Sequence, residues 1–264
     1  MKKILFRILI CVLVICVIAS AGYGLGQLGF YCKGNGADYS VKKTETTDSL
    51  LKGKTVIFLG SSVTYGARSL GESFVDFLVK QDGIIAVKEA KSGTTLVDDK
   101  GDSYISRMKK IDAALKPDLF VCQLSTNDAV QGKPLGKVTA SFDREKFDTH
   151  TVAGAIEYII SYAKDTWDCP VMFYTNTLFE NTEYEDMIFL LREIQVKWHI
   201  GVIDLFNDKE MCKVSDEDLK LYMADAIHPT RAGYRDWWTP VIRERIILYL
   251  GLRTDLITGT IREK

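Results

Sequence analysis

The chain has 264 residues, of which 47% are hydrophobic and 26% charged, enough apolar material for one large domain or two small ones. Its 34 lysines and arginines nearly balance 35 aspartates and glutamates, and the formal net charge is -1. Because there is no basic excess, low-complexity run or internal repeat, we expect neither a nucleic-acid-binding protein nor a disordered or repeat protein.

Residues 1–31 predict a segment that targets the chain to a membrane. Basic residues near the start precede an uncharged run over residues 8–31, and a helix needs about 20 apolar residues to cross a bilayer. The positive flank places the following domain outside the cytoplasm. Residues 8–21 also have the length of a signal-peptide core, and residues 19–21 (Ala-Ser-Ala) resemble a cleavage site. We therefore expect either a single-pass cell-membrane protein or, after cleavage, a secreted one.

Residues 32–53 are polar and predict a tether between the membrane and the domain.

Of the 6 cysteines, two lie in the membrane segment and Cys122 lies in an apolar run. Cys32, Cys169 and Cys212 remain, an odd number without metal-type spacing. The cysteines are expected to be structural or incidental.

The main domain is predicted over residues 54–252, with a tail over residues 253–264. Short apolar strands are expected at residues 55–59, 84–87, 119–124, 171–174 and 202–205. Helical patterns lie between and after them, at residues 72–81, 103–115, 151–165, 184–198 and 231–250. This alternation predicts a three-layer α/β/α sandwich, flavodoxin-like, around a five-stranded parallel sheet.

Small and polar residues follow several of the predicted strands and precede the last helix. In a parallel sheet, ligands bind outside the carboxyl ends of the strands, so these residues are expected to face one edge. The segments are residues 60–66, 92–95, 125–128 and 225–230.

These segments hold the groups that acyl transfer by a serine requires, namely a base, an orienting carboxylate and donors for the oxyanion. Histidine is the usual base because the pKa of an unperturbed imidazole lies near neutrality. Of the 3 histidines, His150 lies in an unpatterned excursion and His199 ends a predicted helix. His228 has Asp225 three residues before it. An isolated Asp-x-x-His pair is weak evidence, so the order of all four segments matters.

In that order the segments resemble the four sequence blocks of the SGNH/GDSL hydrolase superfamily, the GDSL-like serine esterases, lipases and acylhydrolases. The resemblance covers essentially the whole predicted domain and implies the SGNH-hydrolase fold. It implies a triad of Ser62 as nucleophile, His228 as base and Asp225 as acid. It further implies an oxyanion hole formed by Ser62, Gly93 and Asn127, with no metal or organic cofactor required.

The chain departs from the family pattern at three positions that flank these groups. Ser61 stands where the family usually has aspartate, Val63 where it often has leucine, and Ser125 where it usually has glycine. None of these positions carries a reacting group, so the proton-transfer chemistry is expected to be retained. The hydrogen bonds around the nucleophile are expected to differ.

The leading hypothesis is hydrolysis of a carboxylic ester, from a small molecule or a carbohydrate, with acetylated polysaccharide as one substrate class. The same triad serves an acyltransferase acting on cell-envelope sugars, because water and alcohol acceptors differ only in which one reaches the acyl-enzyme. A catalytically silent carbohydrate-binding domain is the alternative from another class.

Four further features are candidates for substrate contacts, each with a simpler structural interpretation. Residues 129–150 are either a specificity element or an ordinary surface loop. Residues 175–177 either bind a polar substrate or satisfy a turn. Trp237 and Trp238 either line an apolar surface or belong to the helix core, and Asp128 is expected to cap a turn and is not counted as catalytic.

Overall fold

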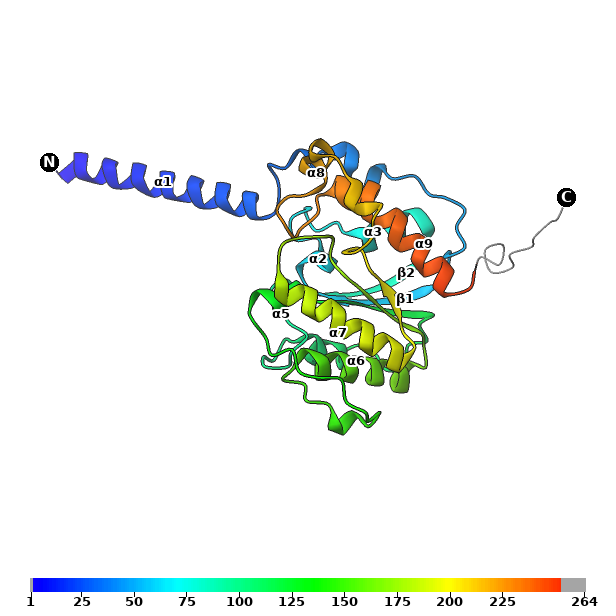
Figure 1. Ribbon diagram of the computed structural model, residues 1–264. Helices are drawn as coiled ribbons and strands as arrows, with labels where there is room; N and C mark the ends of the chain where they lie inside the picture. Colours follow the sequence, from blue (N-terminus) through cyan, green and yellow to red (C-terminus); the bar gives the residue numbers. More distant parts are fainter. Residues whose placement is uncertain (1, 253–264) are drawn as a thin grey trace.

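The computed structural model describes residues 2–252, with side chains from residue 12 onward, and the predicted tail at residues 253–264 lies outside them. Five strands form one parallel sheet in the order β2-β1-β3-β4-β5 (Figure 1). The strands are β1 (Thr55–Gly60), β2 (Ile85–Ala90), β3 (Leu119–Gln123), β4 (Val171–Tyr174) and β5 (Gly201–Ile203). This confirms the predicted five-stranded α/β fold.

Side chains alternate between the two faces of the sheet, as the two-residue period of a strand requires. In β1, Ile57 and Leu59 belong to the core on one face, whereas Val56 and Phe58 belong to the core on the other. The sheet is therefore buried on both sides, which explains why its strands are continuous apolar runs.

Helices cover each face. The first face packs against α4 (Tyr104–Met108), α6 (Val152–Trp167) and α7 (Thr182–Trp198). The opposite face packs against α3 (Phe74–Asp82), a π-helical segment at Gly233–Trp238 and α9 (Thr239–Tyr249). Figure 1 shows α6 and α7 below the sheet and α3 and α9 above it.

Several helices differ from the predicted boundaries. The helix expected at residues 103–115 ends at Met108, and the Asp112 side chain further along accepts the N–H of Ala114 at 2.9 Å, which favours a turn there. Short helices that the pattern did not reveal are α2 (Ser62–Tyr65), α5 (Thr126–Val130) and α8 (Asp216–Tyr222). The first two begin at the carboxyl edge of the sheet, directly after β1 and β3, so they decide where the polar side chains there point.

Helix α1 (Lys2–Gln27) extends away from the domain as a single rod (Figure 1). From residue 12 onward it exposes large apolar side chains, including Leu13, Ile15 and Ile18. Among the residues that the structure describes, no helix is both long and apolar enough to cross a membrane. The membrane segment stays a prediction.

Residues 32–53, predicted as a tether, are in contact with the domain. They contain three short 3-10 helices, Lys33–Asn35, Ala37–Tyr39 and Val41–Lys43. Asn35 is 5% exposed, and the N–H of Thr47 donates to the carbonyl of Gln81 at 2.8 Å. Contacts with the domain thus begin well before residue 54, and the domain boundary itself stays a prediction.

Candidate active site

Ser62 lies at the sharp turn from β1 into α2, at the carboxyl edge of the sheet. A Cβ atom at Gly60 would lie 1.7 Å from the Thr64 hydroxyl oxygen, so only glycine fits at the end of the strand. Ser62 itself is 7% exposed, with its Oγ directed to His228. The tight turn presents the hydroxyl while burying the rest of the residue.

Gln123, the last residue of β3, lies beneath this turn. Its Oε1 accepts the backbone N–H of Ser61 at 2.9 Å and the Ser61 hydroxyl at 3.3 Å. The same oxygen accepts the Thr64 hydroxyl at 2.8 Å, and Thr64 also contacts the hydroxyl of Tyr174 at 2.6 Å. At the position where the family has aspartate, this chain therefore has a neutral, buried hydrogen-bond network.

Ser62, His228 and Asp225 are brought together in one continuous chain of contacts. The Nε2 atom of His228 lies 2.9 Å from the Ser62 Oγ. The Nδ1 atom of His228 lies 2.8 Å from Oδ1 and 3.0 Å from Oδ2 of Asp225. These are the distances and the order that a serine nucleophile, a general base and an orienting carboxylate require.

The Asp225 carboxylate is held by several donors. Its Oδ1 accepts the backbone N–H groups of Ile227 and His228, both at 2.9 Å. Its Oδ2 accepts the Nε–H of Arg68 at 3.2 Å. Burial raises the pKa of Asp225, but the hydrogen bond and charge of His228, with the backbone donors, outweigh burial and hold that pKa well below its ordinary value. Asp225 is therefore a charged carboxylate in contact with the His228 imidazole.

The second group of predicted residues, Gly93 and Asn127, follows strands β2 and β3, the two neighbours of β1 in the sheet. Gly93 is exposed and has a φ of 79°, in the left-handed region. Asn127, in α5, donates one N–H of its amide to the Thr94 carbonyl at 2.9 Å. An amide NH₂ has a second donor, and among the described residues no acceptor contacts it. Ser62 is the first residue of α2, so its N–H has no acceptor within that helix.

The loop that carries Gly93, residues 93–97, is held by two buried side chains. Asp128 accepts the N–H groups of Leu96 and Val97 at 2.8 and 3.0 Å. Arg107 donates to the Thr94 hydroxyl at 3.0 Å and to the Gly60 carbonyl at 2.8 Å. Burial raises the pKa of Asp128 above its ordinary value, although its hydrogen bonds with Ser125 and the loop oppose this. Asp128 thus holds the loop that carries Gly93, and within the part of the chain that the structure describes it forms no hydrogen bond with Ser62, Asp225 or His228.

The remaining candidates have mainly structural contacts. Asn176 donates to the Ile227 carbonyl at 3.2 Å and so holds the loop between Asp225 and His228. Trp238 is fully buried in the core, as its simpler interpretation predicts. In the excursion at residues 129–150, Phe142 and Phe147 pack against the indole of Trp198 at the end of α7.

A cavity of about 650 Å³ opens beside Asp225, between the loop after β4 and α8. Its walls are mainly apolar, and Trp237 stacks on Tyr222 with ring centroids 5.8 Å apart. The Trp237 indole nitrogen and the Thr177 hydroxyl are buried without a hydrogen-bond partner among the described residues. Other lining residues are Leu178, Phe179, Leu219, Lys220, Met223 and Ala226.

Three supporting residues, Arg68, Arg107 and Gln123, were not found by sequence reasoning. Arg107 and Gln123 have polar side chains within predicted regular elements, where a polar residue is normally solvent-exposed. Their burial beneath the turn at Ser62 was the missing information.

Within the described residues, no cluster of three or more His, Cys, Asp or Glu side chains could hold a metal ion.

Comparison with known proteins gives the family of the chain. The model of the GDSL-like Lipase/Acylhydrolase family matches residues 58–235 and so includes Ser62, Gly93, Asn127, Asp225 and His228. The chain belongs to the GDSL-like lipase/acylhydrolase family, and this supports a hydrolase. No curated protein matches the chain.

Several solved structures share the fold. A protein from Lactobacillus plantarum has a TM-score of 0.62 and 19% identity, covering 76% of this chain and 97% of its own. A candidate GDSL-like lipase from Bacteroides ovatus has a TM-score of 0.56 and 20% identity, covering 76% of this chain and 100% of its own. A family two carbohydrate esterase from Clostridium thermocellum, in complex with cellohexaose, has a TM-score of 0.54 and 14% identity. The match covers 76% of this chain and 65% of the esterase chain.

Proposed function

We propose that the protein hydrolyses carboxylic esters through Ser62, His228 and Asp225. The observation that carries this proposal is the continuous chain from the Ser62 Oγ through His228 to the charged Asp225 carboxylate, with contacts of 2.8–3.0 Å. Such a chain removes the serine proton as the hydroxyl attacks, which is the step that a free serine performs poorly.

In the proposed reaction, His228 takes the proton of Ser62 while the Oγ forms a bond to the ester carbonyl carbon. The negative charge on the carbonyl oxygen is stabilised by the N–H groups of Ser62 and Gly93 and by the second amide N–H of Asn127. His228 then gives its proton to the departing alcohol as the C–O bond breaks. Water attacks the acyl-serine by the same path and releases the acid.

Replacement of the nucleophile tests the reaction. Ser62→Ala should abolish turnover of a small chromogenic ester and labelling by a fluorophosphonate probe, with the circular dichroism spectrum unchanged. Ser61→Ala is the matched control, since that neighbouring hydroxyl contacts the Gln123 side chain and not His228 or Asp225. Full activity in Ser62→Ala would contradict the proposal. Free acid released without an added sugar acceptor supports hydrolysis. Release of the alcohol only when a sugar is added, with the acyl group transferred to that sugar and no free acid formed, would indicate a transferase.

We further propose that the alcohol part of the ester is a carbohydrate that occupies the cavity beside Asp225. His228 protonates the departing alcohol in this reaction, and the cavity lies beside Asp225, the residue that contacts the His228 imidazole. A mainly apolar wall that includes the Trp237 side chain suits a sugar, because a sugar ring has an apolar face that packs on aromatic side chains. The carbohydrate esterase with the same fold is consistent with this class.

A panel of acetylated sugars and of acyl esters of increasing chain length tests the substrate class. We expect Trp237→Ala to raise KM for an acetylated oligosaccharide about tenfold and to leave KM for a small chromogenic acetate unchanged. Preference for long acyl chains, with no effect of Trp237→Ala on any sugar ester, would overturn the carbohydrate proposal.

Residues 1–31 are proposed to target this domain to the cell membrane or to secretion, as the uncharged run after a positive flank indicates. Fractionation of the cells that make the protein, followed by amino-terminal sequencing, tests both fates. Intact protein in the membrane fraction indicates an anchor, and a new terminus at Gly22 indicates cleavage. Intact protein in the cytosol would overturn the proposal.

A further inference from the structure

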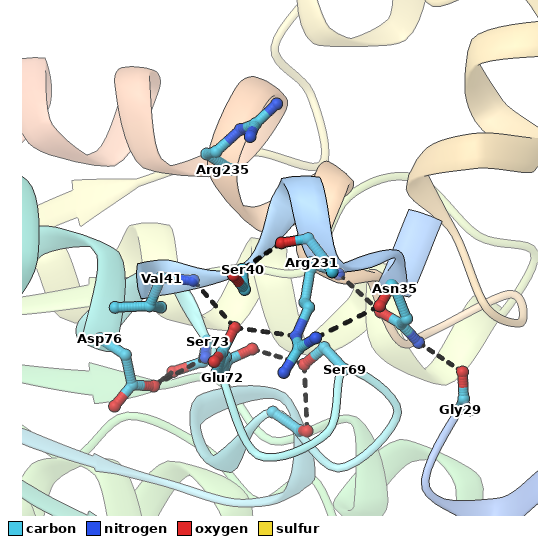
Figure 2. Close-up of polar contacts among 12 residues, drawn as sticks. Gly29, Asn35, Ser40, Val41, Ser69, Glu72, Ser73, Asp76, Arg231 and Arg235 are labelled. Carbon is cyan, nitrogen blue, oxygen red and sulfur yellow. Dashed lines mark hydrogen bonds and ion pairs between the residues drawn. The ribbon is translucent and has the colours of Figure 1, made fainter. Parts of the chain in front are cut away.

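The segment that links α1 to the domain contacts both loops that carry the triad, although it lies before the residues that the family model matches. Asn35 is the centre of these contacts and is 5% exposed. Its Nδ2 donates to the carbonyl of Gly29 at 2.6 Å and to the carbonyl of Arg68 at 2.7 Å, and its Oδ1 accepts the N–H of Arg231 at 2.8 Å. Figure 2 shows Asn35 between Gly29 and Arg231.

The two residues that Asn35 joins follow the reacting groups closely in the chain. Arg68 lies in the loop after the Ser62 helix, and Arg231 comes three residues after His228. One buried side chain therefore fixes the nucleophile loop and the acid–base loop to each other. An asparagine amide has two donors and one acceptor oxygen, and all three groups are used here.

The backbone of the segment approaches these loops too closely for a side chain. Gly29 has a φ of 81°, and a Cβ atom there would lie 1.9 Å from the Arg68 carbonyl oxygen. The N–H of Leu70 also donates to the carbonyl of Leu28 at 3.2 Å. The segment is thus packed against the nucleophile loop by backbone contacts as well as by Asn35.

Arg68 extends the connection to the catalytic carboxylate. Its Nε donates to Oδ2 of Asp225 at 3.2 Å, the oxygen that receives no backbone N–H. Its Nη1 donates to the Gly26 carbonyl at 3.0 Å and to Oε1 of Gln27 at 3.2 Å, at the end of α1. The guanidinium therefore holds the carboxylate from one side and is itself held by the last turn of the helix.

A second ion pair fixes the same loops. Arg231 Nε lies 2.8 Å from Oε2 of Glu72, which also accepts the N–H of Val41 at 3.0 Å. Nη1 of Arg231 donates to the Asn35 carbonyl at 3.2 Å. Figure 2 shows Arg231 reaching both Glu72 and Asn35.

We propose that residues 26–35 form an N-terminal clamp on the two loops that carry the triad. Asn35, which lies in the clamp, and Arg68, which the clamp holds, are positioning residues that keep Ser62 and the Asp225–His228 pair in reactive alignment. The proposal rests on the ester-hydrolase function above. Neither residue contacts the reacting atoms, so the clamp acts on the rate of the chemical step and leaves binding of a small ester unchanged.

The test compares variants of the full chain on a small chromogenic acetate. Asn35→Ala and Arg68→Gln should each lower kcat about tenfold to a hundredfold with KM unchanged, because small misplacements of reacting groups have effects of that size. Arg68→Lys should restore part of the rate, since it returns a positive charge to Asp225 but cannot reach α1 as well. Fluorophosphonate labelling of Ser62 should slow in parallel.

Arg235→Gln is the matched control. Arg235 donates to the Asp38 carbonyl at 2.7 Å, so it joins the same N-terminal region to the domain without contacting a triad loop. The kcat of Arg235→Gln should equal that of the unchanged protein. An equal loss of kcat in Arg235→Gln, or unchanged kcat in folded Asn35→Ala and Arg68→Gln, would overturn the clamp.

Two further results keep this test separate from that of the function. If Asn35→Ala does not fold, Arg68→Gln decides, because the Arg68 side chain is partly exposed. If Ser62→Ala retains activity, the proposed function fails. If Ser62→Ala is inactive while the clamp variants keep full kcat, only the clamp fails.

Discussion

On one side of Ser62, the hydroxyl, the imidazole and the carboxylate already form a continuous chain of contacts of 2.8–3.0 Å. On the other side, the three expected oxyanion donors are Ser62, Gly93 and Asn127, and each presents an N–H without an acceptor among the described residues. In the proposed mechanism, the acid–base side consists of contacts within the protein, whereas the oxyanion side acts through contacts with the substrate. The acid–base side is therefore tested by replacing a residue of the triad. The oxyanion side is tested by replacing a donor and by replacing a residue that holds the loop of Gly93.

The largest expected effect comes from the acid–base side. His228→Ala should lower kcat for a small chromogenic ester by about 10⁴-fold or more, because the serine then has no base. Steady-state kinetics measures the loss, and His199→Ala is the control at a helix end remote from Ser62. A loss below tenfold would show that the observed contact is not used in turnover.

On the oxyanion side, Asn127→Ala should lower kcat by about 10²–10³-fold, the usual effect of removing one oxyanion donor. KM should change little, since the donor acts mainly on the charge of the transition state. Asn181→Ala provides a control, because that side chain caps α7 and its loss should cost about 1 kcal/mol of stability without changing kcat. Equal kcat for Asn127→Ala and the unchanged protein would exclude Asn127 from the hole.

The support of the oxyanion loop gives a smaller effect. Asp128→Asn replaces one of the two oxygens that accept the N–H groups of Leu96 and Val97 with an NH₂ group, which cannot accept. We expect a loss of about 1–3 kcal/mol in the free energy of unfolding and a fall in kcat of about tenfold. Urea denaturation and steady-state kinetics on the same sample measure both. Loss of stability with full kcat would separate the loop from catalysis.

The smallest effect is the pH dependence that Asp225 gives to stability. Its pKa is held below the ordinary value in the folded protein, so its stabilising contribution is present above the ordinary pKa and is lost as pH falls through the lower, folded value. The difference in the free energy of unfolding between the unchanged protein and Asp225→Asn should therefore shrink from about pH 6 to about pH 3. A difference that is constant or grows on acidification would contradict the ion-pair interpretation.

The sequence predicts those parts of the molecule that depend on neighbouring residues. The strands were found because buried parallel strands are continuous apolar runs, and observed and predicted bounds agree within a few residues. Ser62, Gly93, Asn127 and the Asp225–His228 pair were found because each lies in a short local motif. The placement of Ser62, Gly93 and Asn127 at one edge follows from the parallel topology, whereas the Asp225–His228 loop follows α8 and is held by the hydrogen bond from Asn176 to Ile227.

The supporting residues could not be found in this way, because their partners are distant in the chain. Arg68 contacts Asp225 across 157 positions, and Gln123 contacts Ser61 across 62. A polar residue in a helix or strand pattern normally predicts an exposed position, so Arg107 gave no signal. The polar composition of residues 32–53 predicted a tether. Asn35 is nevertheless buried, and its amide donates to the carbonyls of Gly29 and Arg68 and accepts the N–H of Arg231.

The contacts between Arg68 and the end of α1 bear on how the protein matures. A signal peptidase that cut after Ala21 would leave Gly22 at the new amino terminus, and Gly26, Gln27 and Asn35 all lie beyond that point. The processed chain would keep every residue that contacts Arg68 and Asp225 from this segment. Cleavage and retention would then change where the domain is held while the turnover number of each molecule stays the same.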